Sequence, residues 1–333
     1  MGGYFEIKNL KVDFKTFDGG KNVINIDNLS LDKGETFGIV GESGAGKTVL
    51  ALAILRLLFS PPAFVRDGSI LFEGEELLKK TERDMQKIRG RRISMIFQDP
   101  MSTLNPVFTV GEQIVRVLRS KNRVSRKKAV KEALEMIDMV KLPDAGRIMN
   151  KYPHELSGGQ RQRIVIAIAL SCGAEMLIAD EPTRNLDVTI QAGILKLIAE
   201  LQKELGVTVL FIANNLGLVS ATCEKIAILH SGRIVETGTV REVLKDPRHP
   251  YTRTLINAIP KNRGQRVNVE KVSFKEDKSV CEGWCRYYSR CTEKQDICRM
   301  QGPVLRPVGG MHMTACHLAL KGGGIGGKGN IEG

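Results

Sequence analysis

The feature that most constrains this chain of 333 residues is a glycine-rich segment between a strand pattern and a helix pattern. The segment GESGAGKT runs from Gly41 to Thr48; the apolar run Thr36–Val40 precedes it and the helical pattern VLALAILRLL follows it. Glycines let backbone N–H groups turn inward around an anion, and a helix start adds partial positive charge. The spacing GxxxxGK[ST] in this setting predicts a loop that holds nucleotide phosphates.

Single residues of this loop have distinct expected roles. Lys47 would reach the β and γ phosphates, and the Thr48 hydroxyl would ligate Mg²⁺. The remaining phosphate contacts are expected from the backbone of Gly41, Ser43, Gly44, Ala45 and Gly46.

A second segment places two carboxylates at the end of a buried strand. In MLIADEP, which starts at Met176, four apolar residues lead into Asp180 and Glu181. Ligands of open α/β sheets bind at the carboxyl ends of the strands. We expect Asp180 to hold Mg²⁺ and Glu181 to orient or deprotonate an attacking water.

A third segment, LSGGQ, begins at Leu156 and precedes a helical pattern. Ser157 is a good candidate for the helix N-cap, and Gly158 and Gly159 leave backbone donors exposed beside it. The segment is therefore predicted to be a second anion-binding helix start.

Strand and helix patterns alternate along much of the chain, which predicts an α/β fold: a mostly parallel sheet with helices on both faces. Two alternating runs within residues 4–31 predict an antiparallel β subdomain, and residues 99–157 a helical subdomain. We expect a nucleotide-binding domain over residues 1–258. A small cysteine-rich extension would follow at 259–320, with a disordered glycine-rich tail at 321–333.

The ordered series GESGAGKT, IFQDP with Gln98, LSGGQRQR and MLIADEPT resembles the ATP-binding subunits of ABC transporters, over roughly residues 4–255. The strings QDPMSTLNP, KYPHELSGGQRQR, LDVTIQ and HPYTRTL are similar to one branch, the dipeptide, oligopeptide and nickel importer ATPases. This resemblance implies a P-loop NTPase core and an ATP-hydrolysing subunit that powers uptake of peptides or nickel.

The resemblance also implies a dimer, formed with a second copy or a homologous ATPase, that encloses two ATP molecules. Each phosphate loop would meet the other subunit's Ser157, Gly158, Gly159, Gln160 and Asp187. Gln98 would contact Mg²⁺ and sense the γ-phosphate. Phe17 is a candidate for stacking on adenine, and a core or surface phenylalanine is the alternative.

The same resemblance implies two membrane permease subunits and, indirectly, a solute-binding protein as partners. It places the chain at the cytoplasmic face of the cell membrane. The longest uncharged run, from Leu205 to Cys223, contains several polar residues, so we expect a buried strand and a turn there, not a membrane span.

Two positions depart from the family pattern. Where the family has a histidine after the strand 207–212, this chain has Asn214, which cannot relay a proton. Losing one preorganised donor typically costs on the order of 10²–10³ in rate, so we expect ATP binding with slow hydrolysis. Arg184 and Asn185 replace small residues; a cation there could alter the dimer seam or pair with a phosphate or a carboxylate.

Five of the seven cysteines lie near the C-terminus. Clustered cysteines in an intracellular protein favour a metal site over disulfides. A zinc knuckle of the CxxC type is absent, and the wide spacing suits a [4Fe–4S] cluster better. Zinc and free thiols stay as alternatives. The resemblance selects Cys285, Cys291, Cys298 and Cys316 as ligands and leaves Cys281 as a spare.

The formal net charge of +13 fits nucleic-acid binding, an anionic ligand or the face of a membrane complex. A non-transport ABC-type ATPase acting on nucleic acid is therefore the competing hypothesis. One Trp and five Tyr offer few rings for base stacking. We expect no nucleic-acid partner.

Overall fold

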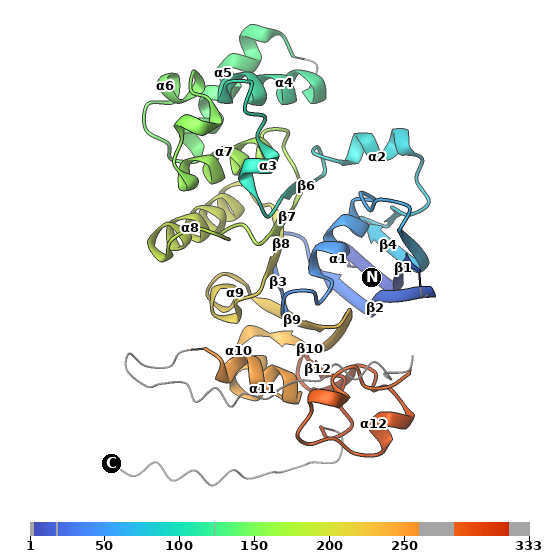
Figure 1. The fold of residues 1–333 in the computed structure, drawn as a ribbon. Coiled ribbons are helices and arrows are strands. Elements are labelled where there is room, and N and C mark those ends of the chain that lie inside the picture. Colours follow the sequence, from blue (N-terminus) through green and yellow to red (C-terminus); the bar gives the residue numbers. More distant parts are fainter. Residues whose placement is uncertain (1–2, 18, 123, 260–282, 320–333) are drawn as a thin grey trace, which may run out of the picture.

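The computed structural model describes residues 3–17, 19–122, 124–259 and 283–319. Cys281 and the glycine-rich tail at 321–333 lie outside these residues. The described chain is built on two sheets (Figure 1). Two hydrophobic cores lie one on each side of the larger sheet.

The larger sheet carries the strands that precede the predicted site residues. Five neighbouring strands, β9-β3-β8-β7-β6, are parallel, and the strands beyond β9 continue the sheet with antiparallel pairs. The sheet order is β11 (Arg306–Gly309), β12 (His312–Thr314), β10 (Arg233–Thr239), β9 (Lys225–His230), β3 (Thr36–Val40), β8 (Thr208–Ala213), β7 (Met176–Asp180) and β6 (Ile93–Ile96). All residues of β3, β7 and β8 are buried, as expected for strands covered on both faces.

The smaller sheet is antiparallel, as predicted for the N-terminal segment. Its order is β2 (Gly19–Leu31), β1 (Phe5–Thr16), β4 (Ala63–Phe72) and β5 (Glu75–Glu76). Its apolar face packs against α1 (Lys47–Ile54) and one face of the larger sheet in a single core. Helix α2 (Glu82–Ile88) follows, capped by the Thr81 side chain.

Helices cover the other face of the larger sheet and form the second core. Helices α4 to α6 stand at the end of the molecule farthest from the C-terminal residues (Figure 1). The helices are α3 (Pro100–Thr103), α4 (Val110–Asn122), α5 (Arg126–Met139), α6 (Ala145–Met149), α7 (Gly158–Leu170), α8 (Val188–Leu205), α9 (Leu216–Thr222), α10 (Val240–Lys245) and α11 (Pro250–Asn257), with a short 3-10 turn η1 (Pro153–Glu155). No helix of the described ranges has the length and apolarity needed to cross a membrane.

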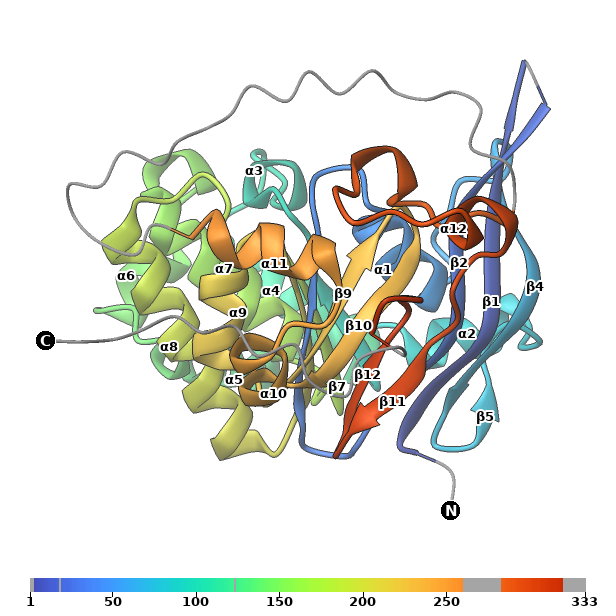
Figure 2. The same ribbon diagram turned by 90° about the horizontal axis from the view of Figure 1, so that it is seen from below.

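The predicted cysteine-rich extension is described from residue 283 to residue 319, and its strands continue the larger sheet. The extension contains η2 (Tyr288–Arg290), α12 (Ile297–Met300), β11 and β12, and β12 pairs with β10 (Figure 2). Glu236 of β10 is fully buried; its carboxylate accepts from the N–H groups of Arg248 and His249 at 2.6 and 2.9 Å. His312 Nε2 lies 2.6 Å from the same carboxylate. A buried carboxylate needs such partners, so Glu236 ties the extension to the core.

Candidate functional site

The phosphate loop joins β3 to α1, and its backbone course requires glycine at two positions. Gly46 has φ of 100°, a left-handed conformation that side chains rarely adopt. A Cβ on Gly41 would lie 2.2 Å from the Leu229 carbonyl oxygen. Ser43, Gly44 and Thr48 remain exposed, so the loop is open to a ligand from solvent.

Lys47 is buried beneath this loop, pointing towards the end of β7. Its Nζ donates to the carbonyl oxygens of Gly41 and Glu42 at 2.9 and 3.0 Å, and lies 3.7 Å from Glu181 Oε1. Burial lowers the pKa of Lys47, and the charges of Glu181 and Asp180 oppose that shift. The structure thus brings the predicted cation and both predicted carboxylates together.

Asp180, the last residue of β7, has the features of a magnesium ligand. Both carboxylate oxygens are buried, and neither makes a hydrogen bond of ordinary geometry within the described residues. Burial raises the pKa of Asp180, and the neighbouring Thr48 hydroxyl acts in the opposite direction. An orphaned buried carboxylate beside a hydroxyl fits the oxygen ligands that Mg²⁺ prefers.

Glu181 is fixed by its backbone and by two side chains. Its φ of 45° is left-handed, and its N–H donates to the Ile212 carbonyl oxygen of β8 at 2.8 Å. Gln98 Nε2 donates to Glu181 Oε2 at 2.7 Å, and Arg184 Nη1 lies 3.4 Å from that oxygen. Of the possibilities considered for Arg184, the structure therefore supports pairing with a carboxylate. Left-handed backbone conformations of residues other than glycine, such as that of Glu181, cluster at functional sites.

The residues expected to act across a dimer begin two helices. Ser157 caps α7: its Oγ accepts from the Gln160 N–H at 3.3 Å, and Gln160 Oε1 accepts from the Ser157 N–H at 3.0 Å. Gly159 is packed so closely that a Cβ would lie 2.8 Å from Ile190 Cγ2. Asp187 caps α8 by accepting from the Ile190 N–H at 2.9 Å. Ser157 and Asp187 are exposed.

Two further candidates lie on the surface. Phe17 is fully exposed beside the end of β1, which excludes the core alternative. Asn214 is also exposed and directly follows β8. Its place at the carboxyl end of a strand next to β7 fits a polar group facing the bound phosphates.

Sequence reasoning missed the support that surrounds Glu42 in the phosphate loop. The Glu42 N–H donates to Tyr251 Oη at 3.0 Å, and the Glu42 carboxylate pairs with Arg290 of the C-terminal extension. The string HPYTRTL, which contains Tyr251, carries a family resemblance but no local signal of this contact. Nothing in the local pattern around Arg290 indicated its partner.

The four selected cysteines surround one small cavity of about 20 Å³, as free thiols. Burial raises the pKa of Cys285 to about 11 and also raises the pKa of Cys291 and of Cys316. Across the described ranges, no group of three or more His, Cys, Asp or Glu side chains is arranged to hold a metal ion. The four thiols line one cavity, and a metal site is not shown.

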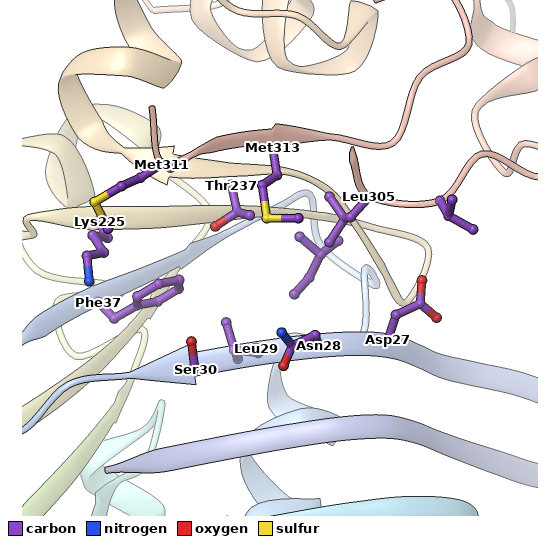
Figure 3. A pocket seen from close by; sticks show the side chains of 13 residues that line it. Asp27, Asn28, Leu29, Ser30, Phe37, Lys225, Thr237, Leu305, Met311 and Met313 are labelled. Atoms are coloured by element: carbon purple, nitrogen blue, oxygen red, sulfur yellow. The ribbon is translucent and has the colours of Figure 1, made fainter. Parts of the chain in front are cut away.

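A larger cavity, of about 440 Å³, lies away from the phosphate loop. Figure 3 shows it between β2 and the C-terminal strands, with Phe37, Leu305 and Met313 pointing into it. Lys225 borders it and pairs with Asp32 and Glu35. None of the predicted site residues lines this cavity.

The fold and the site together define an α/β phosphate-loop nucleotide-binding domain. The ABC transporter family matches residues 24–184, and the C-terminal region of oligopeptide/dipeptide transporters matches residues 235–298. A solved dimeric ATP-binding cassette, described in a post-hydrolysis state with ADP and phosphate, superposes with a TM-score of 0.63 at 29% identity. That similarity covers 71% of this chain and 99% of the cassette.

Curated relatives match over most of the chain. A probable peptide ABC transporter ATP-binding protein of Sinorhizobium fredii is 43% identical, covering 93% of both chains. The oligopeptide transport ATP-binding protein of Bacillus subtilis is 49% identical, over 77% of this chain and 71% of its own length. A dipeptide transport ATP-binding protein of Bacillus subtilis is 40% identical, over 96% of this chain and 95% of its own.

The chain belongs to the ATP-binding proteins of peptide ABC transporters, and it is an ABC-type ATPase. The predicted family and fold class are confirmed. These relatives do not favour the competing hypothesis of an ATPase that acts on nucleic acid.

Asn214 provides a direct test of the rate predicted from the sequence. We expect Asn214→His to raise steady-state ATP turnover by about 10²-fold, because histidine reaches farther towards the developing phosphate charge than the asparagine amide and, unlike it, can be protonated. The measurement is phosphate release by the full chain. Asn257→His, at an exposed position on α11, is the control. Equal turnover of wild type and Asn214→His would contradict the prediction.

Proposed function

We propose that this chain is the ATP-hydrolysing subunit of an ABC importer that takes up dipeptides or oligopeptides. The observation that carries this proposal is the convergence of Lys47, Asp180 and Glu181, with Gln98 bonded to Glu181. The peptide substrate is inferred from the relatives' names and from the match to the oligopeptide/dipeptide C-terminal region. Nickel is the competing cargo.

Each group at the site has one task in ATP hydrolysis. The loop backbone and Lys47 bind the phosphates, while Asp180, Thr48 and Gln98 would hold Mg²⁺, which neutralises developing charge. Glu181 orients or deprotonates water for in-line attack on the γ-phosphate. Its bond to Gln98 links water positioning to the residue proposed to sense the γ-phosphate.

The site is proposed to be complete only in a dimer, with ATP between one phosphate loop and the partner's α7 start. The exposed Ser157 cap and the exposed start of α8 at Asp187 support this proposal, as does the dimeric state of the similar cassette. Phe17 would stack on adenine. We also propose the domain limits 1–258, with a helical subdomain at 99–157, and 259–320.

Closure of this dimer would move two membrane permease subunits, which would hold the chain at the cytoplasmic face of the membrane. A solute-binding protein would deliver the peptide from outside. With no membrane-crossing helix in the described ranges, the membrane contact would come from the permeases.

Transport by the assembled complex tests this function. Tagged chain isolated from membranes of its own cells should bring down two membrane permease subunits. In vesicles, the complex should take up labelled oligopeptide only with Mg-ATP, and Glu181→Gln should lower uptake by about 10²-fold because the water is no longer activated.

Glu204→Gln, at an exposed position of α8, is the matched control and should transport at the wild-type rate. Uptake of nickel but not of peptide would contradict the substrate assignment. Peptide uptake that does not depend on ATP or on Glu181 would contradict the proposed role of the chain.

We propose further that Cys285, Cys291, Cys298 and Cys316 hold a [4Fe–4S] cluster. Four thiols around one cavity match the ligand set of such clusters, and the Cys285 N–H donates to the Cys298 carbonyl oxygen at 2.9 Å. A cluster there would serve as a structural staple for a segment too small to fold alone. Zinc and free thiols are the alternatives.

Anaerobic purification with iron and sulfide assays distinguishes these alternatives. About four iron and four sulfide per chain are expected for wild type, with the visible absorption of a cluster. Cys298→Ser should lose both iron and absorption, and Cys172→Ser, whose cysteine lies outside the cluster, should keep them. Zinc in place of iron, or no metal at all, would contradict the assignment.

A further inference from the structure

The segment between Cys285 and Cys291 reaches back to the phosphate loop, 248 residues away in sequence. Arg290, directly before Cys291, pairs with Glu42 through both guanidinium nitrogens: Nη1 to Oε2 at 2.6 Å and Nη2 to Oε1 at 2.8 Å. A bidentate pair of this kind fixes position as well as charge. The C-terminal extension therefore holds a residue of the loop that receives the phosphates.

Glu42 is the second residue of that loop and is held from three sides. Its carbonyl oxygen accepts from Lys47, its N–H donates to Tyr251 Oη, and its carboxylate pairs with Arg290. The Glu42 backbone is thus hydrogen-bonded to the Lys47 ammonium, the group expected to bind the phosphates. A shift of Glu42 would move the carbonyl that positions Lys47.

The charge at this position also matters, because Glu42 places a carboxylate within an anion-binding loop. The hydrogen bonds from Arg290 hold the pKa of Glu42 below its usual value, so the carboxylate stays ionised and paired. Without the guanidinium, an unpaired negative charge would stand next to the triphosphate. Like charges repel, and a partly buried site screens them less than bulk water does.

Aromatic packing holds the segment that carries Arg290. The Tyr287 ring packs against His230 and Tyr251 at centroid distances of 5.2 and 5.4 Å, and Tyr287 itself is buried. The Arg286 guanidinium bonds to the Ser231 carbonyl oxygen and to Asn22 Oδ1. The contacts of Tyr287, Arg286 and Arg290 bind this segment to the strands and to the loop around the nucleotide site.

We propose that Arg290 of the C-terminal extension is a positioning residue for ATP binding, acting through Glu42 on the phosphate loop. It neutralises the one carboxylate of the loop and holds the backbone that orients Lys47. The extension is thereby a working part of the nucleotide site. This inference rests on the proposed function, in which ATP binds at Lys47.

The test is ATP affinity of the full chain, measured by equilibrium titration with Mg-ATP. Arg290→Ala should raise Kd about tenfold, and Arg290→Lys, which keeps charge but loses the fork, about threefold. In steady-state turnover the change should appear in KM, with kcat little altered, because Arg290 bonds to Glu42 and not to Glu181, the residue proposed to act on water. Wild-type binding of ATP tests the proposed function separately.

A rescue experiment separates this role from a general structural one. Arg290→Ala combined with Glu42→Gln removes both charges, so its Kd should return to within about threefold of wild type. Arg253→Ala is the matched control: Arg253 pairs with Glu293 at 2.8 Å and also joins the extension to the core, away from the loop. It should leave Kd at the wild-type value.

Three results would overturn the inference: an Arg290→Ala Kd within twofold of wild type, an equal loss in Arg253→Ala, or no rescue in the double variant. If Arg290→Ala lowered the melting temperature so far that binding could not be measured, Arg290→Lys and Glu42→Gln, titrated singly and combined, would measure the coupling that depends on the guanidinium fork. Zero coupling there would also overturn it.

Discussion

The buried ammonium of Lys47 is the interaction on which the rest of the site depends. A buried charge is costly unless it is paired, and here the carbonyls of Gly41 and Glu42 and the carboxylate of Glu181 surround it. That arrangement ties the phosphate loop to the end of β7 before any nucleotide arrives. Glu181, which follows β7, contacts both Lys47 of the loop and Gln98, so these three segments pack closely together.

The parallel sheet makes this possible. Strands β3, β8 and β7 are neighbours with the same direction, so their carboxyl ends meet at one edge although Val40 and Asp180 are far apart in sequence. The antiparallel sheet covers α1 from the other side. The C-terminal residues continue the same large sheet beyond β10 and send Arg290 to the loop, so both ends of the chain support one site.

Sequence reasoning succeeded where function rests on local pattern. The strand at Thr36–Val40, the Ser157 cap and the strand at Met176–Asp180 were all predicted, because each is encoded by adjacent residues. It failed where partners are remote or the elements short. Helix α1 ends at Ile54, earlier than the apolar pattern suggested, because Arg56 turns into a left-handed conformation. The three-residue strand β12 and the Arg290–Glu42 pair have no periodicity to reveal them.

Binding of ATP to Lys47→Ala, compared with wild type with and without Mg²⁺, tests the central claim most directly. The account predicts that wild type binds ATP and does so more tightly with Mg²⁺, because Asp180, Thr48 and the phosphates would then all coordinate the same ion. Lys47→Ala should lose at least about tenfold in affinity in both conditions. Unchanged affinity in Lys47→Ala, with an unchanged effect of Mg²⁺, would contradict the account.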